Sequence, residues 1–88
     1  MTKPDKPSGA RLSLKTQVGD NVATLLDDQL DCTLISGGMS VDQGIPFGHK
    51  VALAPIAAGE TVIKYGVVIG HAKTGIREGE HVHVHNIE

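Results

Sequence analysis

The chain has almost no aromatic residues: among its 88 residues there is one tyrosine, one phenylalanine and no tryptophan. A hydrophobic core must therefore consist of valine, isoleucine, leucine and alanine, and a chain this short buries only a modest fraction of its surface. With 8 basic residues against 10 acidic ones and almost no aromatic surface, nucleic-acid binding is not expected. We expect one domain of modest stability, which a metal, an oligomer or a partner subunit can supplement.

Cysteine and long apolar runs are also scarce. Cys32 is the single cysteine, so no internal disulfide can form, and a reducing compartment fits the chain. No apolar run approaches the ~20 residues of a membrane helix, and the first residues contain no apolar signal core. We therefore predict a cytoplasmic protein without membrane association. Residues 1–11, rich in proline and lysine, are predicted to be a disordered lead-in, and residues 12–88 the folded domain.

Short β-rich runs separated by turn residues dominate the folded part. These runs are 31–36, 49–54, 61–65, 67–69 and 81–87. Their spacing is expected of a small sandwich or barrel, whereas residues 21–26 fit either a strand or about one and a half turns of helix. No window has a sustained period of 3.6 residues. The predicted fold class is mostly β with short strands and at most one short helix, and the alternative is a mixed α+β domain.

The second half contains an internal repeat. Residues 56–62 (IAAGETV) are matched 20 positions later by residues 76–82 (IREGEHV). Each copy reads as a tight turn at a glycine, which supplies a positive φ angle, followed by the start of a strand. The repeat predicts a pseudo-symmetric β fold, with two unrelated but similar hairpin turns as the alternative.

Three of the five histidines, His81, His83 and His85, occupy alternate positions in the C-terminal segment. In an extended strand such residues share one face. Neutral imidazole is the commonest metal ligand, and its charge changes near neutral pH. Residues two apart lie about 6.5–7 Å from each other at Cα, so two such rings can converge on one ion at ~2.1 Å per bond. We predict these three histidines as metal ligands, and His83 and His85 also as catalytic residues. A solvated, histidine-rich face is the alternative.

Further candidates lie elsewhere in the second half. His49 and His71 each follow a glycine, which leaves room for a ligand, although both also suit hydrogen-bonded positions at strand starts. Lys64 can bind a carboxylate or sulfonate as a point charge and is the third predicted catalytic residue; its alternative role is to protect a strand edge. The predicted substrate-binding residues are His49, Tyr65, His71 and Asn86. For Tyr65 and Asn86 the alternatives are packing and a turn.

Several motifs occur in an order that resembles a known module: 48–60 (GHKVALAPIAAGE), 62–66 (VIKYG), 69–72 (IGHA) and 79–86 (GEHVHVHN). Over roughly residues 12–87 the chain resembles the small N-terminal SAF-type domain of the altronate/galactarate dehydratase family. The resemblance implies a β-clip fold, an elaborated hairpin bend that suits the 20-residue repeat.

The resemblance also implies a function. Full-length members of the family join this module to a larger catalytic domain and dehydrate sugar acids with an Fe²⁺- or Mn²⁺-type metal. The chain stops where the linker would begin and is similar to the small subunit of the two-subunit sulfolactate sulfo-lyase, which eliminates sulfite from 3-sulfolactate. The resemblance therefore implies a lyase small subunit, inactive without its large subunit, that acts on a small carboxylate substrate by β-elimination. The alternative function is a non-catalytic scaffold module that orients a large subunit. The alternative assembly is a homo-oligomer.

Overall fold

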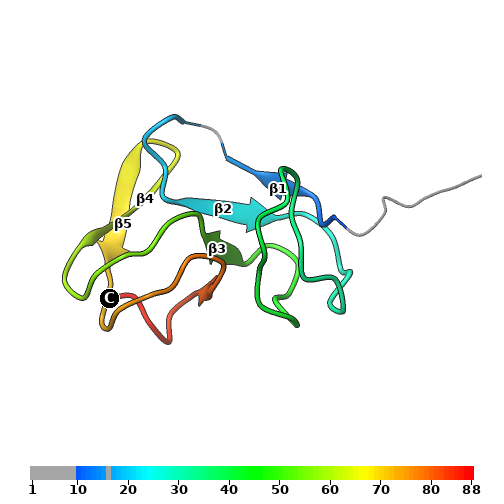
Figure 1. The fold of residues 1–88 in the computed structure, drawn as a ribbon. Helices are drawn as coiled ribbons and strands as arrows, with labels where there is room; N and C mark the ends of the chain where they lie inside the picture. Colours follow the sequence, from blue (N-terminus) through cyan, green and yellow to red (C-terminus); the bar gives the residue numbers. More distant parts are fainter. Residues whose placement is uncertain (1–9, 16) are drawn as a thin grey trace, which may run out of the picture.

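The computed structural model describes residues 10–15 and 17–88, and within them the chain forms six β-strands and no helix (Figure 1). The strands are β1 (Ser13–Leu14), β2 (Val22–Leu25), β3 (Lys50–Ala52), β4 (Thr61–Lys64), β5 (Val67–His71) and β6 (His81–Val82). The prediction of a mostly β fold is confirmed, and the ambiguous segment 21–26 contains strand β2. No helix able to cross a membrane occurs in the described part of the chain.

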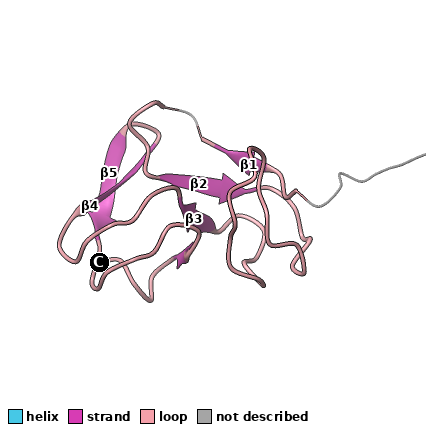
Figure 2. Cartoon of the chain, in the orientation of Figure 1, coloured by secondary structure: helices cyan, strands magenta, loops and turns pink. Residues whose placement is uncertain are grey.

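The strands form two antiparallel sheets connected by long loops (Figure 2). One sheet has four strands in the order β1-β2-β3-β6, and the other is the β4–β5 hairpin. At the tip of this hairpin, Tyr65 and Gly66 both have positive φ angles, 57° and 73°. The carboxylate of Asp20 accepts hydrogen bonds from both of their backbone N–H groups, at 3.0 and 2.8 Å. A carboxylate from the loop before β2 thus fixes the tight turn.

The core consists of two clusters that follow from the alternation of side chains along β2 and β3. Val22 and Ala52 are paired across the strands and lie in one cluster, whereas the neighbouring pair, Ala23 and Val51, lies in the other. The first cluster also contains Val82. Both sides of the four-stranded sheet are therefore covered, which explains why every residue of β2 is buried.

The 20-residue repeat is confirmed as a pseudo-two-fold arrangement. Ile56 and Ile76, the first residues of the two copies, form an antiparallel bridge with each other. The glycines at equivalent positions, Gly59 and Gly79, have φ angles of 86° and 84°. Each donates its N–H across the axis at 2.8 Å, the first to the Ala72 carbonyl and the second to the carbonyl of Ala52, again 20 residues apart. The two halves therefore exchange equivalent hydrogen bonds.

Two buried or half-buried asparagines repeat the same contact in the two halves. The Asn21 side chain donates to the Thr61 carbonyl at 2.9 Å and accepts from the Ile63 N–H at 2.7 Å. The Asn86 side chain donates to the carbonyl of residue 81 at 2.9 Å and accepts from the N–H of residue 83 at 3.0 Å. Each asparagine amide thus pairs with one backbone carbonyl and with the N–H two residues further on, so neither of these backbone groups lacks a hydrogen-bond partner.

Two of the predicted strands were wrong: one is much shorter than expected, and the other does not form a continuous strand. The segment 81–87 was expected to be one extended strand, but β6 ends at Val82, and Asn86 N–H donates to the His83 carbonyl at 3.0 Å, which closes a turn. The segment 31–36 forms only isolated bridges, at Leu34 and Ile35. In both cases side-chain or turn hydrogen bonds satisfy the backbone in place of a continuous ladder.

The predicted lead-in lies mostly outside the described residues, which exclude 1–9. Arg11, which the prediction placed in the lead-in, is completely buried. Its Nε donates to Asp27 Oδ1 at 2.8 Å, and its Nη1 donates to the Ile45 carbonyl at 2.6 Å. Burial alone would raise the pKa of Asp27, but hydrogen bonds from the Leu12 N–H and the Arg11 guanidinium hold that pKa below its usual value. Residue 11 therefore belongs to the folded domain.

Candidate metal centre

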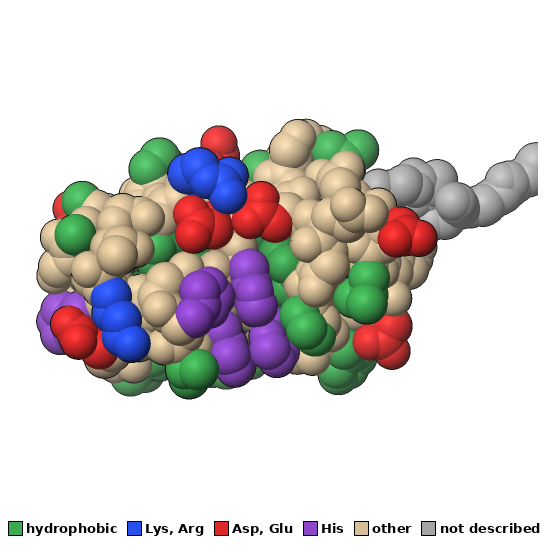
Figure 3. Space-filling model, turned by 90° about the horizontal axis from the view of Figure 1, so that it is seen from below, with side chains coloured by type: hydrophobic (Ala, Val, Ile, Leu, Met, Phe, Trp, Pro, Cys, Tyr) green, Lys and Arg blue, Asp and Glu red, His purple; other side chains and the backbone are tan. Residues whose placement is uncertain are grey.

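Histidine side chains gather in one patch on the face of the molecule shown in Figure 3. Ring contacts link four of them: His49, which directly precedes β3, His81 in β6, and His83 and His85 in the following turn. The shortest separation is 3.9 Å between the ring centroids of His49 and His83, whose planes differ by 13°. Residues more than 30 positions apart are thus stacked against one another.

The pairing of β3 with β6 builds this cluster. Lys50 pairs with Val82 and Val51 with His81, so extending the register by one residue places His49 opposite His83. Directly opposed residues in an antiparallel pair lie on the same face of the sheet, and alternate residues of one strand share that face. The three imidazoles therefore meet because two short strands are paired in this register.

The spacing of the three imidazoles suits a metal ion. One ligand atom each of His49, His81 and His83 can be chosen so that all lie within 4.8 Å of one another. His49 Nδ1 and His81 Nε2 are 2.9 Å apart. Ligands bound at ~2.1 Å and at right angles around an ion would be about 3.0 Å apart. The Nδ1 atom of His83 is buried without a hydrogen-bond partner in the described part of the chain, a position that a metal bond would satisfy. These residues can hold a metal ion.

The surroundings of His81 and His83 favour the neutral imidazole, which is the form that binds metals. Burial lowers the pKa of His81 to about 4, and the nearby His85, His49 and His83 contribute in the same direction. The pKa of His83 is also lowered, first by desolvation and then by the charges of His49 and Lys50. Lys50 was not identified from the sequence as a residue near the site, although it directly follows His49.

Two of the predicted site residues have different surroundings from those expected. His85 is exposed and tilted by 46° against His81, with ring centroids 5.0 Å apart, and His49 replaces it in the three-ligand group. Asn86, predicted to bind substrate, is buried, and both ends of its amide are bonded to the backbone of His81 and His83. Its contacts make it a positioning residue for the two histidines.

The remaining predicted residues lie outside the imidazole cluster. Lys64 ends β4, and its Nζ lies 4.8 Å from the ring centroid of Tyr65 in the hairpin turn. His71 ends β5, is exposed, and exchanges backbone hydrogen bonds with Glu88. None of these three residues belongs to the group of imidazoles among the described residues.

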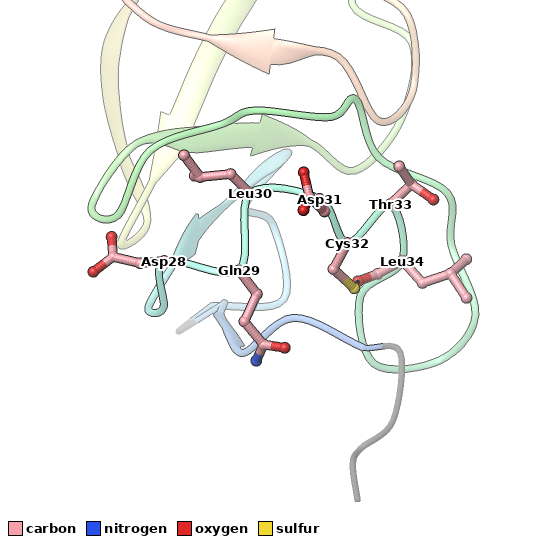
Figure 4. Close-up of a pocket in the computed structure, with 7 residues that line it drawn as sticks. All are labelled: Asp28, Gln29, Leu30, Asp31, Cys32, Thr33 and Leu34. Carbon is pink, nitrogen blue, oxygen red and sulfur yellow. Dashed lines mark hydrogen bonds between the residues drawn. The ribbon is translucent and has the colours of Figure 1, made fainter.

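A hollow of about 880 Å³ lies away from the histidines, along the loop after β2 (Figure 4). Its lining is the continuous segment 28–34. In Figure 4 the carboxylates of Asp28 and Asp31 point away from each other, so they do not converge on a common point. Cys32 is half-buried here, and its Sγ lies 3.5 Å from the Leu34 carbonyl. This open surface gathers no reactive groups comparable with the imidazole cluster.

The fold and the site define a small all-β domain with a three-imidazole cluster able to hold a metal. Residues 11–88 match the altronate/galactarate dehydratase SAF domain, and the chain belongs to this family. The resemblance inferred from the motifs is therefore confirmed.

Similar proteins include enzyme subunits and complete enzymes. The chain is 56% identical over 48 residues to the (2R)-sulfolactate sulfo-lyase subunit alpha of Chromohalobacter salexigens, a match that covers 54% of this chain and 51% of that subunit. It is 55% identical over 42 residues to the same subunit of Paracoccus pantotrophus, covering 48% and 63%. It is 43% identical over 76 residues to altronate dehydratase of Escherichia coli, covering 83% of this chain and 15% of that enzyme. The chain thus spans about half the length of the sulfo-lyase subunit and a small part of the dehydratase.

Proposed function

We propose that this chain is the small subunit of a cytoplasmic, metal-dependent lyase that acts by β-elimination on a 2-hydroxy acid. The observation that carries the proposal is the His49–His81–His83 cluster, located within a domain homologous to a sulfo-lyase subunit and to dehydratases. The substrate is a sugar acid that loses water or 3-sulfolactate that loses sulfite. In both reactions a proton is removed next to a carboxylate and a leaving group departs from the adjacent carbon.

Elimination next to a carboxylate requires a base, an acid for the leaving group and stabilisation of the developing negative charge. A divalent ion of the Fe²⁺ or Mn²⁺ type bound by the three imidazoles would supply a Lewis acid for the carboxylate and hydroxyl oxygens of the substrate. His85 is exposed at the edge of the cluster, so it is free to accept or donate a proton. Asn86 holds the backbone of residues 81 and 83, which limits the movement of both rings.

The site requires completion by a second subunit. Three imidazoles leave open coordination positions, and the cluster lies on the surface of the domain (Figure 3). We expect the isolated chain to bind metal weakly and to be inactive. In titrations with Mn²⁺, Fe²⁺ and Zn²⁺, replacing both His49 and His83 by Ala should remove most of the affinity, whereas His71→Ala should leave it unchanged. Equal affinity in the double variant would contradict this ligand set.

Activity can be tested by isolating the tagged chain from its host together with the large subunit. The His83→Gln small subunit, assayed with saturating large subunit, should lower kcat by about 10²-fold or more. The fold should be retained, since His83 is only half-buried and follows the end of β6. His71→Gln is the matched control, because His71 is an exposed histidine outside the cluster. Equal rates of wild type and His83→Gln would refute a catalytic role of the cluster.

A scaffold module that orients a large subunit is the second candidate, and one feature favours it. The outer strand β5 exposes Val67, Val68 and Ile69 in succession, at 59%, 52% and 41% of their surface. Consecutive exposed apolar residues on a strand are typical of an interaction surface. If the scaffold candidate is correct, Val68→Lys should abolish association with the large subunit, while the histidine variants remain fully active.

A further inference from the structure

The outer edge of β5 is open along the first three residues of the strand. At the end of the strand, His71 exchanges two backbone hydrogen bonds with Glu88, each 2.9 Å long. Val67, Val68 and Ile69 form no backbone hydrogen bond outside the β4–β5 ladder within the described residues. In a two-residue hairpin the residues that flank the turn form the bonded pair, so the next residue, Val68, directs its N–H and C=O outward.

Two other strand edges are covered by asparagine side chains. The amide of Asn21 pairs with backbone groups on the outer edge of β4, and the amide of Asn86 does so on the outer edge of β6. No side chain covers β5 in this way in the part of the chain that the structure describes, and Val67, Val68 and Ile69 are all exposed. Since consecutive side chains point to opposite faces, neither face of β5 is covered there. An apolar strand edge without protection is a site for pairing with another strand.

We propose that the open edge of β5 pairs with the same edge of a second copy of this chain, antiparallel, about a two-fold axis at Val68. The outward N–H and C=O groups of one copy then bond to the same groups of the other, which a two-fold axis requires. The two β4–β5 hairpins become one continuous sheet. This assigns β5 to a second copy and not to a large subunit, and it does not depend on the proposed function.

The charges at the two ends of the open edge favour a second copy as the occupant. No charged residue occurs between Lys64 and His71, so two copies bring no like charges together along the paired stretch. Lys64 pairs with Val67 beside the hairpin turn, and Glu88 lies beside His71 at the opposite end of β5 (Figure 1). These ends are four residues apart along β5, about 13 Å. Antiparallel pairing places the lysine end of each copy beside the glutamate end of the other, so two opposite-charge contacts form across the axis.

Sedimentation of the full chain over a wide range of concentration tests the pairing. The wild type should form a dimer as the concentration rises. Val68→Lys should weaken dimerisation by about tenfold or more, because burial of two valine side chains is lost and two ammonium groups oppose each other at the axis. Val84→Lys is the matched control, since Val84 is an exposed valine in the turn after β6, outside the hairpin. It should dimerise as the wild type does.

Charge reversal identifies the occupant. Lys64→Glu and Glu88→Lys should each weaken the dimer, and the double variant should recover much of the lost affinity, because opposite charges then meet again. A double variant that dimerises no better than the single ones would overturn the proposal. So would a chain that stays monomeric at every concentration and in which Val68→Lys removes only the association with a large subunit.

Hydrogen exchange of the wild type provides a second measurement if Val68→Lys fails to fold. The backbone amide of Val68 should exchange more slowly as the protein concentration rises, because the second copy accepts its hydrogen bond. The amide of Val84, away from the edge, should exchange at the same rate throughout. An exchange rate at Val68 that does not change between dilute and concentrated protein would refute the strand pairing.

Discussion

Asn86 should control the metal centre without being a ligand. Its buried amide joins the carbonyl of His81 and the N–H of His83, at 2.9 and 3.0 Å. Asn86→Ala leaves both backbone groups without their partner in a buried position. Each lost hydrogen bond of this kind costs about 1–2 kcal/mol, so we expect unfolding free energy to fall by about 2–4 kcal/mol.

Metal binding should weaken together with stability. Asn86→Ala releases the turn that holds His83 against His49. Loss of a residue that orients metal ligands commonly costs about 10–100-fold in metal affinity. The matched control is Asn21→Ala. Asn21 makes the same pair of backbone contacts with residues 61 and 63, at 2.9 and 2.7 Å, but lies in the half without the cluster.

The two asparagine variants can be compared by urea denaturation and by calorimetric titration with Mn²⁺ and Zn²⁺. Both should be destabilised, but only Asn86→Ala should have weaker metal binding when measured well below its unfolding midpoint. Metal affinity reduced equally in the two variants would show that general loosening of the fold is responsible. Unchanged affinity in Asn86→Ala would refute the positioning role.

Two further predictions concern stability. Gly79→Ala should lower the unfolding free energy by about 3 kcal/mol, because an added Cβ would meet the Ser40 carbonyl oxygen. Gly59→Ala, with a similar φ angle but open space around the added Cβ, should lower it by only about 1 kcal/mol. Equal losses of the two variants in thermal unfolding would contradict this. In metal-free protein, stability should be fully present above pH 6.5 and decline as the pH falls toward about 4, because the unfolded chain takes up a proton that His81 resists in the folded state. The loss should be at most about 3 kcal/mol, reduced to about 1–2 kcal/mol by solvent around the partly exposed ring. Urea midpoints at pH 7 and 4.5 measure it, and His81→Gln, which removes the titrating group, should show a clearly smaller decline; an equal decline would contradict the assignment.

The sequence predicted those features of the fold that depend on local pattern. The 20-residue repeat was visible because the turn glycines and the buried residues of the two copies recur at fixed positions. The strand around Val51 was predicted from its β-branched and apolar run. The prediction of an extended strand at 81–87 was wrong, because the side chain and the backbone of Asn86 both form hydrogen bonds with the backbone of His83, which closes a turn.

The composition of the site was only partly predictable. His81 and His83 were expected together because alternate residues of a strand share a face. The contribution of His49 depends on the register between β3 and β6, and no local pattern specifies how two strands more than 25 residues apart are paired.

The pseudo-symmetry provides an argument about the origin of the histidine cluster. Thr61 and Ile63 occupy the positions of His81 and His83 in the other half, and an asparagine bonds to the backbone of both pairs in the same way. The strand pairings are also equivalent, since His71 opposes Thr61 as Val51 opposes His81. The same backbone geometry thus forms with a threonine and an isoleucine at these positions. Folding therefore does not require imidazoles at 81 and 83, and their presence is better explained by the chemistry that a histidine cluster can perform.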